Sequence, residues 1–173
     1  LFRKITTIDQ AVMFLGFKSV RNIALGVGVF NMFPPQKKDF LSRVWQKSIV
    51  TGLAARELCN LTGNKKKEDA FTVGLLPDIG LIAFYAYDRQ KASNILEKAE
   101  SAGGANLEDE RLYMGLDHVE AGALLAERWR LPKEIIGAMM HHHKEPAEKS
   151  CSGDLAHIIY LGSLAGDIFY LGR

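Results

Sequence analysis

Apolar residues recur at three- and four-residue steps along most of this chain, which is the spacing of one face of an α-helix. One such stripe extends over residues 17–30, and Pro34 and Pro35 forbid its continuation. A second extends over residues 37–61 and stops before Gly63. No segment alternates β-branched and polar residues between turns, as a half-buried strand would. The pattern predicts an all-α protein, built as a compact multi-helix bundle.

Capping and breaking residues divide the chain into shorter helices. Thr7 and Gln10 form a capping box before a helix of about two turns that Gly16 can end. Asp88, Asn106 and Asp117 are predicted N-caps, because their side chains can accept hydrogen bonds from the first free N–H groups of a helix. The remaining predicted helices cover residues 68–76, 81–87, 89–102, 107–114, a segment after Asp117, a segment after Pro132, and 154–171.

The helical pattern is interrupted within residues 71–80, where an apolar helical run stops at Pro77, Asp78 and Gly80. Because regular backbone ends there, Asp78 is delivered to a helix terminus. Residue chemistry alone allows two interpretations. The segment is either a plain Pro-Asp turn between two helices or a place where the fold presents a carboxylate to a pocket.

Length, charge and cysteines narrow the class of protein. A chain of 173 residues with a formal charge of +2 has a core of its own and lacks the concentrated basic charge of a nucleic-acid or anionic-membrane surface. Cys59 and Cys151 have no paired spacing, so we expect reduced thiols in a cytoplasmic protein. His157 and Asp167 interrupt the apolar stretch 155–171, which favours a core helix over a membrane span.

Several short motifs, in order along the chain, resemble the HDOD family, the HD-related output domains of bacterial signalling proteins. This family is a degenerate branch of the HD-type metal phosphohydrolase superfamily. The matching pieces are residues 7–16, 45–48, 70–76, 110–115, His118, residues 122–125, 129–132 and 142–143. The resemblance implies one HDOD-like domain over residues 1–173, sub-divided into an N-terminal helical part (1–35) and an HD-like core (36–173). It also implies a further helical segment upstream.

The resemblance identifies the positions at which the superfamily binds its metal. HD phosphohydrolases use a histidine, a His-Asp pair and a distal aspartate, and the matching positions here are Lys47, Pro77 with Asp78, and Ser163. Only Asp78 is retained. A lysine ammonium donates hydrogen bonds and has no lone pair, and proline offers no ligand atom. We therefore expect no bound metal, no cofactor and no hydrolytic activity.

Three histidines complicate this expectation. His118, His142 and His143 resemble the extra histidines of two-metal superfamily members, so the resemblance implies a residual pocket of these three with Lys47 and Asp78. Residue chemistry alone leaves plainer roles open. His118 lies in the first turn of a predicted helix, where histidines are often structural. Residues 141–143 lie at a helix end, where they either bind a metal or face the negative end of the helix dipole.

These observations lead to a prediction of a non-catalytic bacterial signalling or regulatory domain. It is expected to bind a protein partner, an upstream signalling domain or a nucleotide-like ligand, and to lie free of nucleic acid and membrane. The alternative is a metal-dependent phosphohydrolase with a relocated site at Asp78, His118, His142 and His143. A third possibility is a purely structural helical scaffold.

Overall fold

The computed structural model describes residues 7–10, 12–13, 17, 24, 38–144 and 153–171. The chain divides into two compact units, Leu1–Pro34 and Pro35–Arg173. No strand occurs among the described residues, which confirms the predicted all-α fold. In the first unit, the Gln10 N–H donates to Thr7 Oγ1 at 3.2 Å, as predicted for the cap. The helix ends predicted at Gly16 and Pro34, and Cys151, lie outside the described residues.

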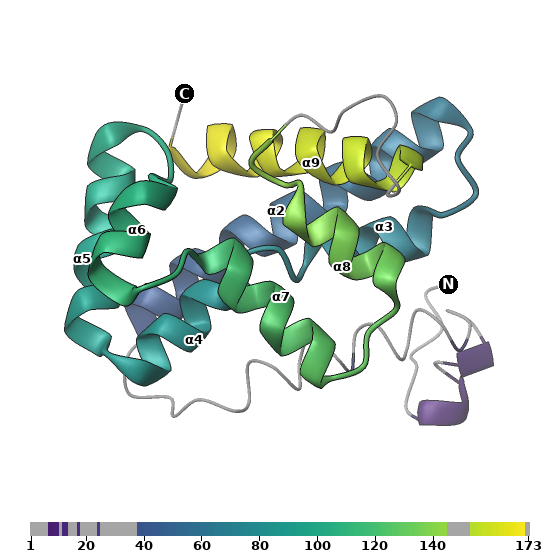
Figure 1. Cartoon of the computed structure of the whole chain (residues 1–173). Coiled ribbons are helices and arrows are strands. Elements are labelled where there is room, and N and C mark those ends of the chain that lie inside the picture. The colour runs from purple at the N-terminus through teal and green to yellow at the C-terminus, as the bar shows by residue number, and fades with distance from the viewer. Residues whose placement is uncertain are drawn as a thin grey trace. The chain divides into compact units, whose positions relative to one another are not determined.

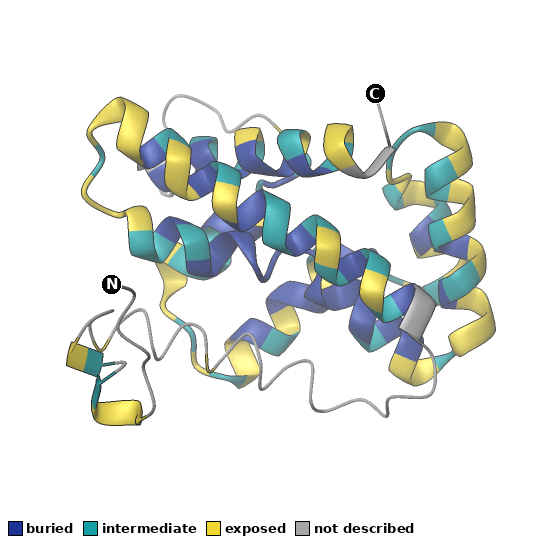
Figure 2. Cartoon of the chain, turned by 180° about the vertical axis from the view of Figure 1, so that it is seen from behind, coloured by how far each residue is buried: buried dark blue, intermediate teal, exposed yellow. Residues whose placement is uncertain are grey.

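The helices of the second unit form a bundle (Figure 1). Their bounds are α2 Lys38–Thr62, α3 Lys67–Gly74, α4 Ile79–Tyr87, α5 Arg89–Ala102, α6 Leu107–Met114, α7 His118–Arg128, α8 Lys133–Met140 and α9 Gly153–Leu171. The long helix α2 packs against α9 and α3, and α4 packs against α7 and α5. Figure 2 shows that buried residues line the facing sides of these helices while exposed residues lie on the outside.

The predicted caps set the starts of three helices, α5, α6 and α7. Asp88 accepts from the N–H groups of Gln90 and Lys91, and Asn106 caps α6 in the same way. Asp117 forms a capping box with Glu120, which makes His118 the first residue of α7. These three predictions are confirmed. Because each cap satisfies free N–H groups locally, the helix starts are fixed by nearby residues rather than by distant packing.

Glycines allow the backbones of neighbouring helices to come into close contact. A Cβ added to Gly74 of α3 would lie 2.6 Å from the Cα of Gly52 in α2, and one added to Gly162 of α9 would lie 2.9 Å from the Thr51 carbonyl oxygen. A Cβ added to Gly80 of α4 would overlap the carbonyl oxygen of His118. Only a residue without a side chain permits these approaches. The glycines therefore bring α2, α4, α7 and α9 close enough for short side chains to meet between them.

The segment of residues 67–87 forms the centre of the unit. It contains α3 and α4, interrupted at Pro77, and residues 72–82 are buried without a gap. Among the described residues it is the one helical segment long and apolar enough to cross a membrane, and 78% of its apolar window is buried inside the protein. That burial is typical of the core helix of a globular domain.

Candidate functional site

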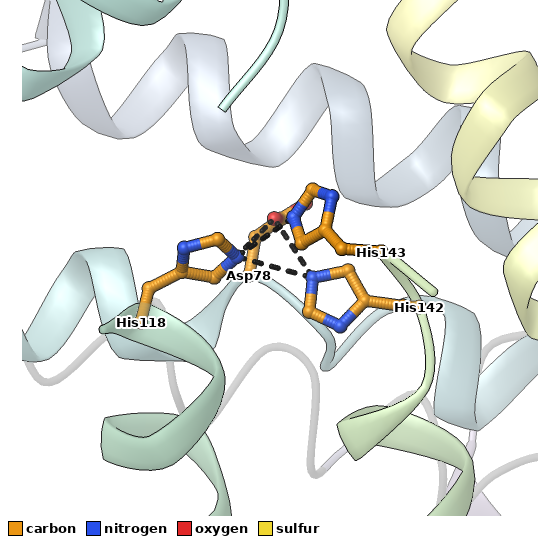
Figure 3. Close-up of side chains that lie close together, drawn as sticks. All are labelled: Asp78, His118, His142 and His143. Carbon is orange, nitrogen blue, oxygen red and sulfur yellow. Dashed lines mark hydrogen bonds and ion pairs between the residues drawn. The ribbon is translucent and has the colours of Figure 1, made fainter. Parts of the chain in front are cut away.

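Asp78 lies at the break between α3 and α4. It occupies the N-cap position of α4, yet its side chain accepts no helix N–H. The carboxylate instead faces three histidines, one from the start of α7 and two from the turn after α8 (Figure 3). Pro77, directly before it, is fully buried. Because proline cannot continue α3, the chain turns here and Asp78 projects into the interior.

His118 comes from the start of α7 and is anchored by α6. The Glu110 carboxylate accepts from the His118 backbone N–H at 2.7 Å and from its Nδ1 at 2.7 and 2.9 Å. An ionised carboxylate only accepts, so Nδ1 carries a proton and Nε2 presents its lone pair in the neutral ring. Nε2 is the atom that points toward Asp78.

His142 and His143 follow the end of α8. The Nδ1–H of His142 donates to the Met139 carbonyl oxygen at 2.5 Å, which again leaves Nε2 with its lone pair. His141, the first residue of the triplet, is turned to the Gly137 carbonyl oxygen of its own helix at 2.7 Å and takes no part in the cluster. Two of the three consecutive histidines therefore reach Asp78.

The four side chains converge on one point, and we name them the histidine–aspartate centre: Asp78, His118, His142 and His143. One ligand atom from each lies within 4.8 Å of the others. The His118 Nε2 is 3.1 Å from the Nε2 of His142 and 3.0 Å from that of His143. The Asp78 Oδ1 is 3.6 Å from the Nε2 atoms of His118 and His142. The structure thus brings together four residues that the sequence scatters over 66 positions.

Burial favours the neutral form of two imidazoles of this centre. It lowers the pKa of His142, and it lowers the pKa of His143 with further contributions from His142, His118 and Lys47. Burial alone would raise the pKa of Asp78, but the Lys47 ammonium and the neighbouring imidazoles hold that pKa well below its usual value. His142 and His143 therefore offer neutral nitrogen donors beside an ionised oxygen donor.

These donors fit one divalent metal ion. Ligands placed tetrahedrally about 2.05 Å from an ion lie roughly 3.3–3.4 Å apart. Four of the six donor–donor distances are 3.0–3.6 Å, and all six lie within 4.8 Å. Without a cation, the lone pairs of His118 Nε2 and His142 Nε2 face each other at 3.1 Å. Glu110 and the Met139 carbonyl orient these two rings as outer partners do in metal sites. From the sequence we expected no bound metal, but the geometry of these four residues favours one.

Lys47 lies on the other side of Asp78. Its Nζ is 3.3 Å from Asp78 Oδ1 and 2.8 Å from Asp167 Oδ1 of α9, and its side chain is 12% exposed. We name these three residues the lysine clamp: Lys47, Asp78 and Asp167. Burial lowers the pKa of Lys47, but the two carboxylates together raise it above its usual value. Lys47 is therefore a fixed ammonium, not a ligand.

Two residues of the site were missed in the sequence. Glu110 is 1% exposed and holds His118, and Asp167 completes the lysine clamp. Asp167 lies one helical turn beyond Ser163, the position matched to the distal aspartate. Ser163 is buried, and its hydroxyl has no hydrogen-bond partner within the described part of the chain. The signal for Asp167 was a carboxylate within the apolar stretch 155–171, because charges in apolar surroundings are almost always paired.

The centre is enclosed. Asp78, His118 and His142 are 1%, 0% and 1% exposed. A cavity of about 40 Å³ lies beside them, bounded by Lys47 and Asp167 within and by the Arg43–Glu100 ion pair toward the surface. Since one water molecule needs about 10–15 Å³ on this measure, the cavity admits a few waters.

Comparison with known proteins supplies a family context for these features. The family model of the HDOD domain matches residues 1–145, a span that contains Asp78 and all three histidines of the centre. An uncharacterized protein of Treponema pallidum is 28% identical over 141 residues, which are 80% of this chain and 27% of that protein.

Three crystal structures share the fold. A Shewanella amazonensis protein, provisionally named a phosphohydrolase, has a TM-score of 0.77 and 26% identity over 96% of this chain and 61% of its own. An HDOD domain protein of unknown function from Geobacter sulfurreducens has a TM-score of 0.71 and 23% identity over 95% of this chain and 55% of its own. The response regulator MmoQ from Methylococcus capsulatus has a TM-score of 0.62 and 23% identity over 96% of this chain. The chain spans less than two thirds of the Treponema, Shewanella and Geobacter proteins.

Proposed function

The chain belongs to the HDOD domain family, and from this we propose that it is a non-hydrolytic regulatory domain of a cytoplasmic bacterial signalling protein. Its output is the binding of a protein partner. The name of the Methylococcus protein, a response regulator of the same fold, supports a regulatory role. The whole protein to which such a domain belongs sets the input signal, and the domain supplies the surface that responds.

The enclosure of the centre is the observation that carries the non-hydrolytic assignment. Pockets that bind drug-sized ligands measure about 300–1,000 Å³, whereas the cavity beside Asp78 measures about 40 Å³. A phosphodiester does not fit there. The described residues around it also place three carboxylates, Asp78, Glu110 and Asp167, against the one ammonium of Lys47. In the absence of a bound metal ion, that excess of negative charge repels a phosphate group.

The larger cavity among the described residues is no better suited to a nucleotide-like ligand. This groove of about 720 Å³ runs between α5 and α6, away from the centre. Its charged residues are Glu97, Lys98 and Asp109, and the Lys98 ammonium already contacts the Tyr113 hydroxyl at 2.8 Å. The groove therefore carries a net negative charge, and its ammonium is already hydrogen-bonded to Tyr113. Both features disfavour the binding of a phosphate group. We favour a protein partner over a nucleotide.

An exposed apolar stripe on α9 supports the protein partner. Leu161, Leu164 and Ile168 are 47%, 40% and 57% exposed and lie within one face of the helix, because they are spaced three and four residues apart. The opposite face of α9 packs on α2 through Gly162 and Gly166. Contiguous apolar patches on a protein surface commonly mark interaction sites.

A photo-crosslinking residue placed in cells tests the partner. With the crosslinker at position 164, we expect one discrete protein adduct. The matched control carries it at Tyr87, which is 83% exposed but lies on α4, away from the stripe in the sequence. Equal labelling at both positions, or none at 164, would remove the support for binding through α9.

A second function, metal-dependent phosphohydrolysis at the relocated site, is favoured by one specific observation. The three Nε2 atoms and Asp78 Oδ1 have the spacing of a metal's ligands. A metal bound there would polarise a phosphoryl oxygen and activate a water. Asp78, His118, His142 and His143 would hold it, and Glu110 would fix the His118 ring.

Hydrolysis assays decide between the two functions. The purified chain is assayed with Mn²⁺ or Zn²⁺ against a chromogenic phosphodiester, a cyclic dinucleotide and a nucleoside monophosphate. We expect no turnover above that of the Asp78→Ala variant. Turnover that disappears in Asp78→Ala, and persists in a Glu127→Ala control on the exposed face of α7, would establish the phosphohydrolase instead.

A further inference from the structure

We propose that Lys47 is a resident cation that takes the place of a second metal ion, so that the histidine–aspartate centre binds a single divalent ion. The inference concerns the number of ions beside Asp78. It rests on the fit of the four ligands to a metal, and it does not depend on the regulatory role proposed above.

The lysine clamp has the form of a cation site already filled. Asp78, from the break between α3 and α4, and Asp167, from α9, direct Oδ1 atoms at the same ammonium, at 3.3 and 2.8 Å. Two carboxylates facing one point repel each other unless a positive charge lies between them. The ammonium supplies that charge through N–H donors alone. Because it has no lone pair, Lys47 cannot itself bind a metal.

Geometry limits the number of ions. The ammonium of Lys47 lies 3.3 Å from Asp78 Oδ1 and 2.8 Å from Asp167 Oδ1, so it occupies the place between these two carboxylates. A second divalent ion at that place would lie against the ammonium, and two cations in contact in a buried site are strongly unfavourable. Among the described residues, the one place left beside Asp78 is the point on which the three histidines converge.

Helix packing keeps the ammonium in place. A Cβ added to Gly166 of α9 would lie 3.3 Å from the Lys47 carbonyl oxygen and 3.5 Å from its Cγ. The stem of Lys47 is therefore held against α9, one residue from Asp167, and its side chain is 12% exposed. This contact and the two ion pairs hold the ammonium between Asp78 and Asp167.

Substitution of Lys47 by histidine removes the positive charge and supplies a nitrogen donor at the same place. An imidazole then stands beside the carboxylates of Asp78 and Asp167, a donor set that suits divalent transition metals. Arginine is the matched control, because it keeps the charge and also has no lone pair. Replacing Asp167 by asparagine in the histidine variant removes one of the new site's anionic donors.

The test counts ions per chain. Purified protein is stripped with a chelator, reloaded with Mn²⁺ or Zn²⁺, desalted and analysed by mass spectrometry for metal; paramagnetic resonance detects coupled Mn²⁺ pairs. We expect about one ion in the wild type and in Lys47→Arg, about two in Lys47→His with a coupled Mn²⁺ signal, and about one in Lys47→His with Asp167→Asn. Circular dichroism verifies that each variant folds, and Lys47→Gln, also neutral and with an oxygen donor, replaces Lys47→His if that variant does not.

Three outcomes would overturn the proposal: a wild type that binds no ion, a wild type that binds two, or a folded Lys47→His and Lys47→Gln that each bind one. A wild type without metal and without hydrolysis would leave the regulatory function standing while this inference fails. If the wild type binds one ion and hydrolyses a substrate, this inference would stand and the regulatory function would fail.

Discussion

The two sides of the Asp78 carboxylate use different chemistry within one fold. On one side, His118, His142 and His143 present ring nitrogens at metal-like spacing. On the other side, Lys47 bridges Asp78 and Asp167 with an ammonium. The site has lost most of the ligands that the superfamily resemblance implies, but it still has metal-binding donors on one side of Asp78. Each side must be judged from the donors that are present, because a lost ligand on one side does not weaken the donors on the other.

The two sides are also held in different ways. The imidazole side depends on hydrogen bonds to Glu110 and to the Met139 carbonyl, and on the close contact of α4 with α7 at Gly80. The lysine side depends on ion pairs and on the packing of α2 against α9 at Gly166. Substitutions can therefore disturb one side and leave the other in place.

Asp78→Ala should have the largest effect, because both sides share this carboxylate. Removing one partner from a buried ion pair leaves the other charge uncompensated, and typically costs about 3–5 kcal/mol. Unfolding in urea measures the loss. The control is Glu127→Ala, an exposed carboxylate on α7, for which the change should stay within about 0.5 kcal/mol. Equal effects would contradict the central position of Asp78.

Acid should destabilise the imidazole side. Burial lowers the pKa values of His142 and His143, so the unfolded chain binds protons first as pH falls through about 6.5. Stability should therefore fall by roughly 2–3 kcal/mol from pH 7.5 to 5.5 in the presence of a chelator. His143→Gln should roughly halve that slope. Asp78 adds nothing in this window, because its folded pKa is lowered and its contribution is lost only below about pH 4. A flat profile would contradict neutral, buried imidazoles.

Gly80→Ala should disturb the imidazole side alone. The added methyl group would overlap the His118 carbonyl oxygen and push α4 from α7, at a cost of about 1–3 kcal/mol. Gly104→Ala is the matched control, since a Cβ there meets nothing within 4 Å and should change stability little. Thermal unfolding compares the two. If both variants melt together, the close approach at Gly80 does not position His118.

The sequence predicted the parts of this site that depend on local chemistry. Asp88, Asn106 and Asp117 were identified as caps because capping needs only neighbouring N–H groups, and the last of these fixes His118 at the start of α7. The break at Pro77 located Asp78 for the same reason. These features follow from residues within about four positions of one another.

Asp167 and Glu110 escaped prediction because their partners are distant in the chain. Asp167 meets Lys47 only when α9 lies on α2, and Glu110 meets His118 only through the angle of the turn between α6 and α7. The meeting of Asp78 with the three histidines was expected from the family resemblance, not from spacing. Tertiary packing decides such contacts, and a single sequence records them only as unexplained charges in apolar segments.

Among substitutions in the site, Asp167→Asn should have the smallest effect, and it is confined to the lysine side. Lys47 keeps its pair with Asp78, and the Asp167 side chain is 25% exposed, so we expect a loss of about 1 kcal/mol in urea unfolding. Glu100→Gln, which breaks a more exposed pair with Arg43, should cost less. A loss as large as that of Asp78→Ala would show that Asp78 and Asp167 contribute equally to the free energy of unfolding.

Anomalous X-ray diffraction from crystals soaked in Mn²⁺ tests the difference between the two sides of Asp78 most directly, because it locates each ion. The account predicts one anomalous peak, enclosed by Asp78, His118, His142 and His143, with the Lys47 ammonium still between Asp78 and Asp167. A peak between Asp78 and Asp167, or no peak among the three imidazoles, would contradict it.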